Sequence, residues 1–212
     1  MIEKSRGMVL RTRPLTETSL IIHWLTPDLG RLAMVAKGAR RPKSPFRGKL
    51  DLFYLADFSF VRSRASELHN LREVGLIETN SFLRQDLRGL QQASYAAALL
   101  EQTTEAETPL PGLYELFCNF LKFLATHPAV SLGLPAFELK LLEHLGLRPD
   151  LTNSRVQPGT RQLIVYLTES EWESLARVKL SATQASEIQQ FLHGFLIYQF
   201  GRLPRATRVV RE

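Results

Sequence analysis

The sequence has little cysteine and no long hydrophobic run. A single cysteine among 212 residues excludes an internal disulfide framework and a cysteine-based zinc cluster within the chain. Such a composition is usual in a reducing compartment, so we expect a cytoplasmic protein. The longest unbroken apolar stretch, residues 95–100, is far shorter than the ~20 residues of a membrane helix. The amino-terminal residues also lack the apolar core of a signal peptide, and we expect no membrane partner.

Motifs for catalysis and cofactor binding are missing as well. No two glycines are spaced as GxG, and Gly48-Lys49 lacks the rest of a P-loop, which excludes the common dinucleotide and phosphate cradles. The five histidines are scattered, without HxH or HExxH spacing. Three alternating glutamates at 169, 171 and 173 have no further Asp or His beside them to complete a metal site. We therefore predict that the protein is not an enzyme and needs neither a cofactor nor a metal.

The positive charge is concentrated in one part of the chain. The formal net charge is +6, and residues 1–80 hold 14 Lys and Arg against 8 Asp and Glu, whereas residues 81–212 hold 13 of each. Between residues 31 and 49 seven basic side chains occur without one acid. Because like charges repel, this grouping favours a surface that a polyanion neutralises, with a solvated surface loop as the alternative. A membrane surface fits less well, since the run has no amphipathic apolar face.

Hydrophobic periodicity divides the chain into a β-rich and a helical part. Alternation with a period of two predicts five strands, at residues 8–13, 19–25, 31–37, 52–62 and 67–74. Such a set suggests a small barrel, either closed or partly open. Helical spacing predicts helices at about 83–104, 113–127, 135–145 and 181–200, the last opened by a capping box at Ser181. The predicted class is α+β: a basic barrel at 1–80, a helical domain at 81–205 with a loop or strand insert at about 147–170, and a basic tail at 206–212.

Several motifs resemble those of the bacterial RecO family of recombination mediators. They are Gly7-Met-Val-Leu-Arg-Thr-Arg13, Glu17-Thr-Ser19, Thr26-Pro-Asp-Leu-Gly30, Val35-Ala-Lys-Gly-Ala-Arg-Arg41, Lys43-Ser44, Phe137-Glu-Leu-Lys-Leu-Leu142 and Leu145-Gly-Leu-Arg-Pro149. The resemblance extends from about residue 5 to about residue 205. Many family members carry four zinc-binding cysteines after the last of these motifs, but residues 152–157 contain none here, so zinc is not expected.

The resemblance implies a five-stranded OB-fold followed by a helical domain, with no catalytic activity. It also implies a DNA repair protein that binds single- and double-stranded DNA non-specifically and anneals complementary strands. Such a protein helps to load the recombinase on DNA coated by single-strand-binding protein, together with a RecR-like partner. Two other functions stay open from the residues alone: a non-catalytic protein-interaction adaptor at replication or repair sites, and an RNA-binding OB module.

OB-folds bind single strands by combining a cationic groove with aromatic platforms. The basic residues predicted to contact DNA are Arg11, Arg13, Arg31, Lys37, Arg40, Arg41, Lys43, Arg47 and Lys49. Phe46 is the only aromatic residue inside the basic run, and it either stacks on a base or plugs one end of the barrel.

Overall fold

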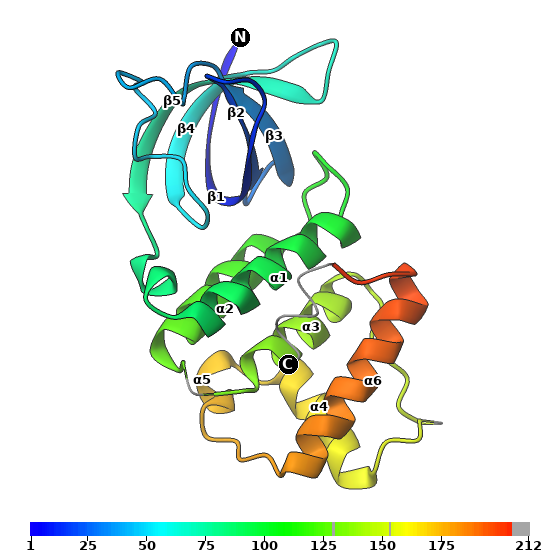
Figure 1. The fold of residues 1–212 in the computed structure, drawn as a ribbon. Coiled ribbons are helices and arrows are strands. Elements are labelled where there is room, and N and C mark those ends of the chain that lie inside the picture. Colours follow the sequence, from blue (N-terminus) through cyan, green and yellow to red (C-terminus); the bar gives the residue numbers. More distant parts are fainter. Residues whose placement is uncertain (129, 153, 205–212) are drawn as a thin grey trace. The chain divides into compact units, whose positions relative to one another are not determined.

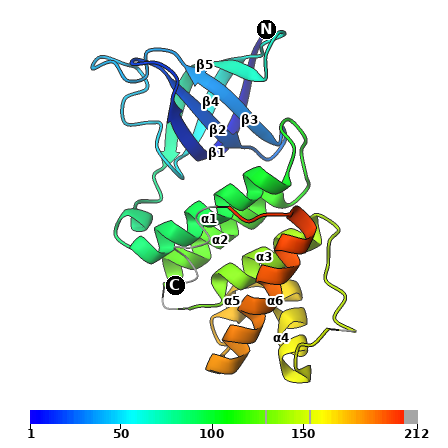
Figure 2. The same cartoon turned by 45° about the vertical axis from the view of Figure 1, so that its right-hand side comes forward.

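The computed structural model describes residues 1–128, 130–152 and 154–204, which form two compact units (Figures 1 and 2). One unit contains residues 1–85 and 100–114, and the other contains residues 86–99 and the described residues from 115 onward. The basic tail expected at 206–212 lies outside the described residues.

The first unit is built on a closed barrel of five strands. The strands are β1 (Ile2–Pro14), β2 (Leu20–Leu25), β3 (Arg31–Ala36), β4 (Leu55–Val61) and β5 (Leu68–Glu78). They are ordered β1-β2-β3-β5-β4 around the barrel, with β3 and β5 parallel and all other neighbours antiparallel. Five short strands closed in this order form an OB-fold, which confirms the predicted class and the five predicted strands.

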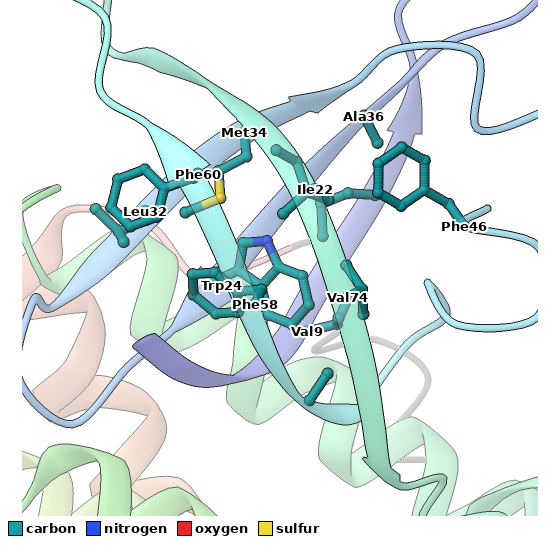
Figure 3. Packing of buried hydrophobic residues seen from close by; sticks show 12 residues of the cluster. Val9, Ile22, Trp24, Leu32, Met34, Ala36, Phe46, Phe58, Phe60 and Val74 are labelled. Atoms are coloured by element: carbon teal, nitrogen blue, oxygen red, sulfur yellow. The ribbon is translucent and has the colours of Figure 1, made fainter. Parts of the chain in front are cut away.

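Alternating residues of the strands fill the barrel with apolar side chains (Figure 3). On β3, Leu32 and Met34 are at most 2% exposed, as the period of two predicts. Trp24 of β2 is fully buried, and its ring centroid lies 4.5 Å from that of Phe58 on β4. Each large apolar side chain buried in this way stabilises the fold by roughly 1.5–3 kcal/mol, so the barrel has a substantial core of its own.

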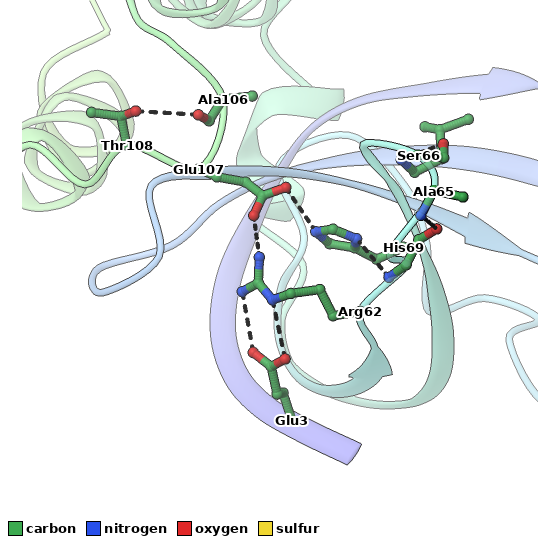
Figure 4. A network of polar contacts seen from close by, with 10 residues as sticks. Glu3, Arg62, Ala65, Ser66, His69, Ala106, Glu107 and Thr108 are labelled. Atoms are coloured by element: carbon green, nitrogen blue, oxygen red, sulfur yellow. Dashed lines mark hydrogen bonds and ion pairs between the residues drawn. The ribbon is translucent and has the colours of Figure 1, made fainter. Parts of the chain in front are cut away.

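Residues 100–114 return from the helical part of the chain to the barrel. The backbone N–H of Glu107 donates to the carbonyl oxygen of Arg31 at 2.8 Å. The Glu107 carboxylate contacts the guanidinium of Arg62 and lies 3.0 Å from Nε2 of His69, and Arg62 also binds Glu3 through two hydrogen bonds of 3.1 Å (Figure 4). The expected boundary at residue 80 separates strands from helices, whereas the spatial unit also includes this later segment.

The remaining elements are helical. They are η1 (Ser81–Arg84), α1 (Leu87–Thr103), α2 (Leu113–Thr126), α3 (Gly133–His144), α4 (Pro158–Glu169), α5 (Trp172–Leu175) and α6 (Ala182–Phe200). The predicted capping box of α6 is present. The backbone N–H of Gln184 donates to Oγ of Ser181 at 3.2 Å, and the backbone N–H of Ser181 donates to the side-chain oxygen of Gln184. None of the described helices is long and apolar enough to cross a membrane.

The expected strand within the 147–170 insert is wrong, because residues 158–169 form α4. Pro158 occupies the first turn, where its missing N–H costs nothing. Thr160, Ile164 and Leu167 are at most 2% exposed and follow one another at helical spacing. A short apolar run such as residues 163–167 cannot be assigned to a strand or a helix from periodicity alone. The helix buries Thr160, Ile164 and Leu167 on one face, which a strand would not do.

Candidate nucleic-acid interface

The basic loop, defined here as residues 37–49, follows β3 and is folded as a series of tight turns. The N–H groups of Arg41, Ser44 and Arg47 each donate to the carbonyl oxygen three residues earlier, at 3.0, 3.1 and 3.2 Å. The side chains of Lys37, Arg40, Arg41, Lys43 and Arg47 are exposed, and that of Lys49 is half-buried. The basic residues of this segment therefore lie on an ordered surface.

Hydrogen bonds attach the basic loop to the turn between β1 and β2. The backbone N–H of Arg40 donates to the carbonyl oxygen of Thr18 at 2.9 Å, and its Nη1 donates to that of Thr16 at 3.2 Å. The N–H of Gly38 donates to Oγ of Ser19 at 3.3 Å. Because these bonds hold the loop in place, less conformational entropy is lost when its charges contact a ligand.

The charges of the basic loop are not used in ion pairs within the described residues. The same holds for Arg13 on β1, which strand register places near the end of the barrel where the loop begins. By contrast, Arg6, Arg62 and Arg84 elsewhere in this unit each pair with a carboxylate, at 2.8, 3.1 and 2.7 Å. Seven of the nine residues predicted to contact DNA thus have no carboxylate partner among the described residues: Arg13, Lys37, Arg40, Arg41, Lys43, Arg47 and Lys49.

The other two predicted contacts have partners inside the protein. Arg31 is half-buried and donates from Nε to Oγ1 of Thr104 at 2.7 Å, with a second hydrogen bond to the Thr104 carbonyl oxygen. Burial lowers the pKa of its guanidinium below the ordinary value. Nε of Arg11 lies 3.2 Å from a carboxylate oxygen of Glu101. These two arginines lie apart from the basic loop in the register of the strands.

Phe46 lies in the barrel core. Its side chain is 6% exposed and belongs to the same buried cluster as Ile22 and Ala36 (Figure 3). A base can stack only on a ring that reaches the surface, so in this structure Phe46 serves to anchor the basic loop.

Glu101 was not among the predicted site residues. Its carboxylate also lies 2.8 Å from Nδ1 of His23. Although burial raises it, the hydrogen bond from His23 and the charges of His23, Arg11 and Arg31 hold the pKa of Glu101 below its ordinary value of 4.5. Nothing in the local sequence signals this site, because the residues that meet there are about 80 to 90 positions apart.

Among the residues that the structure describes, no three His, Cys, Asp or Glu side chains come together in a group that could hold a metal ion. The arrangement that remains is an ordered cationic surface on an OB-fold, which can neutralise the phosphates of a nucleic acid.

Comparison with known proteins identifies the protein family to which this chain is related. The model of the recombination protein O N-terminal domain matches residues 1–80, and that of its C-terminal domain matches residues 84–157. The DNA repair protein RecO of Exiguobacterium sibiricum is 30% identical over all of this chain and 88% of its own length. The chain belongs to the RecO family.

Other RecO proteins show the same relationship. The DNA repair protein RecO of Listeria monocytogenes is 28% identical over 95% of this chain and 80% of its own length. That of Alkaliphilus metalliredigens is 34% identical over 72% of this chain and 62% of its own length. The resemblance stated from the motifs is confirmed, and RecO membership makes this chain a member of a DNA repair protein family.

Proposed function

We propose that this RecO-family protein binds single- and double-stranded DNA through phosphate contacts made by the basic loop and by Arg13. The observation that carries the proposal is the absence of carboxylate partners for these seven cations among the described residues, on a loop held by backbone hydrogen bonds. Contacts of this kind release counterions and carry no base information, so they suit binding without sequence preference.

Annealing follows from the same contacts. Two complementary strands repel each other through their phosphates, and a cationic surface that binds both backbones lowers this repulsion. Since no aromatic ring of the basic loop is accessible, the bases stay available for pairing. By analogy with its family, the protein then acts without catalysis to help load the recombinase on DNA coated by single-strand-binding protein, with a RecR-like partner.

The salt dependence of DNA binding tests the phosphate contacts. If about four of the seven cations contact phosphates, the slope of log K against log salt on single strands is near −3. Fluorescence anisotropy with a labelled oligonucleotide, measured from 50 to 300 mM salt, gives this slope. A slope of zero would rule out phosphate contacts as the source of affinity.

A charge-matched pair of triple variants locates the site. Arg40→Ala/Arg41→Ala/Lys43→Ala removes three cations of the basic loop and is expected to flatten the slope by about 2 units on single strands. The control, Lys122→Ala/Arg177→Ala/Lys179→Ala, removes the same charge from exposed positions of α2 and the segment after α5 and is expected to leave the slope unchanged. Equal effects of both variants would show that only net charge matters.

Two further measurements separate the remaining functions. An RNA-binding module prefers RNA over DNA of the same sequence, because it contacts the 2′-hydroxyl, whereas phosphate contacts alone give similar competition. An adaptor leaves the annealing rate of bare complementary strands unchanged, whereas the proposed protein accelerates it, with and without single-strand-binding protein. Annealing that is lost in the basic-loop variant and kept in its control would support the proposed function.

A further inference from the structure

The Glu101 carboxylate contacts two side chains on the outside of the barrel, Arg11 and His23. Arg11 of β1 and His23 of β2 are directly opposite each other in the strand register. Ile22 and Trp24, which flank His23, belong to the core cluster, so the side chain of His23 is on the outer face. One carboxylate oxygen of Glu101 lies 3.2 Å from Nε of Arg11 and the other 2.8 Å from Nδ1 of His23.

The Glu101 carboxylate occupies a position that a phosphate oxygen could take. A guanidinium such as that of Arg11 makes charge-assisted hydrogen bonds to carboxylate and to phosphate oxygens alike. The side chain of Arg11 remains 52% exposed, whereas that of His23 is only 15% exposed, so an incoming phosphate can reach Arg11 without unfolding of the barrel and His23 holds Glu101 from the inner side. The outer face of β2 and β3 is also a surface on which OB-folds bind oligonucleotides.

The basic loop and this pair of side chains are connected by Arg13. It is exposed, has no carboxylate partner among the described residues, and lies two positions from Arg11 on the same face of β1. A strand bound at the basic loop can therefore continue along β1 towards Arg11, where it meets the Glu101 carboxylate.

We propose that Glu101 masks a further DNA-contacting cation, the half-exposed guanidinium of Arg11, and that DNA phosphates compete with its carboxylate there. The proposal rests on the DNA binding proposed above. In the unbound protein Glu101 neutralises Arg11, and removing the charge of Glu101 makes this guanidinium available. The contact thus limits how much of the barrel a nucleic acid engages.

The test is a variant that binds DNA more tightly. Glu101→Gln keeps the shape of the side chain and removes its charge, so Arg11 gains a free guanidinium. One additional phosphate contact steepens the single-strand slope by about 0.7 and tightens binding on the order of five-fold at 0.1 M salt. The matched control is Glu105→Gln, which changes the net charge equally at an exposed residue with no carboxylate-binding partner in the described structure.

The outcomes are distinct. Tighter binding in Glu101→Gln but not in Glu105→Gln supports masking, and Glu101→Gln/Arg11→Ala is then expected to return to the wild-type slope. Unchanged or weaker binding in folded Glu101→Gln shows that the ion pair is only structural, and equal tightening in the control shows a net-charge effect; either result overturns the proposal.

A second variant protects the test against loss of folding. Glu101→Asp retains the charge and withdraws the carboxylate by one methylene, so it is expected to tighten binding less than Glu101→Gln. If Glu101→Gln fails to fold by circular dichroism, tightening in Glu101→Asp supports masking and unchanged affinity overturns it. The salt slope of the wild type and the affinity of the basic-loop variant test the proposed DNA binding without involving Glu101. Failure of the masking proposal is therefore distinguishable from failure of the proposed function.

Discussion

Arg31 at the start of β3 donates a hydrogen bond from Nε to Oγ1 of Thr104, at 2.7 Å, just after the end of α1. A second N–H of the same guanidinium donates to the Thr104 carbonyl oxygen. A basic residue predicted to contact DNA therefore has a structural role instead. It joins the barrel to residues 100–114, the segment that completes the first unit.

Replacing Arg31 is expected to reduce stability and leave the DNA salt slope unchanged. Arg31→Ala removes two charge-assisted hydrogen bonds and lowers the free energy of unfolding by about 1.5–3 kcal/mol, measurable by urea denaturation. Arg13→Ala is the comparison, because that side chain is exposed and has no carboxylate partner in the described part of the chain; the variant is expected to change stability by no more than ~0.5 kcal/mol and to flatten the slope. A flatter slope in Arg31→Ala would contradict the structural role.

Gly30 permits the close approach of residues 100–114 to the turn before β3. Its φ is +67°, and a Cβ there would lie 2.5 Å from the carbonyl oxygen of Thr108. Gly48 in the basic loop has a similar φ of +71° but open space around its Cβ position. Gly48→Ala is expected to cost about 1–2 kcal/mol for the left-handed backbone, and Gly30→Ala a further ~1–3 kcal/mol for the clash. Equal melting temperatures for the two variants would show that the approach is not tight.

Stability is expected to fall in acid partly through Glu101. Burial raises the pKa of this carboxyl, but the hydrogen bond and charge of His23, with Arg11 and Arg31, lower it below 4.5 in the folded state. A group with a depressed folded pKa stabilises the protein above its unfolded pKa, and this contribution is lost as the pH falls through the folded value.

Thermal melts between pH 7 and pH 3 measure this contribution. Glu101→Gln is expected to be less stable than the wild type at pH 7, and the difference is expected to shrink below about pH 4.5. Part of the acid dependence remains in the variant, because the hydrogen bonds from Arg62 and Arg6 also lower the pKa values of Glu3 and Asp57. A stability difference between the two proteins that stays constant with pH would contradict a lowered pKa of Glu101 in the folded state.

Two substitutions of Phe46 separate packing from base stacking. Phe46→Ala is expected to cost about 3–5 kcal/mol in the free energy of unfolding, because the ring fills the barrel core. Phe46→Leu retains most of the packing and is expected to cost less than ~1.5 kcal/mol, with DNA affinity unchanged. A base stacked on the ring contributes ~1–3 kcal/mol, so an affinity loss of ten-fold or more in folded Phe46→Leu would restore the stacking interpretation.

The strands were predictable because their signals are local. On β3 the alternation of Leu32, Met34 and Ala36 with more exposed residues is a property of six consecutive positions, and the structure buries these three almost completely. The capping box of α6 is equally local. Helix α4 was missed because Ile164 and Leu167 belong to a run too short to show a period, and only their burial among other elements identifies the face.

The position of the basic loop was predictable from charge counting, but its partners were not. Alternation and composition, which are read over short windows, determined a small five-stranded barrel followed by helices and an acid-free cationic segment, and the resemblance to RecO implied that the barrel is an OB-fold. Only the tertiary structure decided that Arg11 and Arg31 are bound by Glu101 and Thr104, and that Phe46 is buried. The physical reason is that ion pairing and burial depend on distances between residues that chain connectivity leaves far apart.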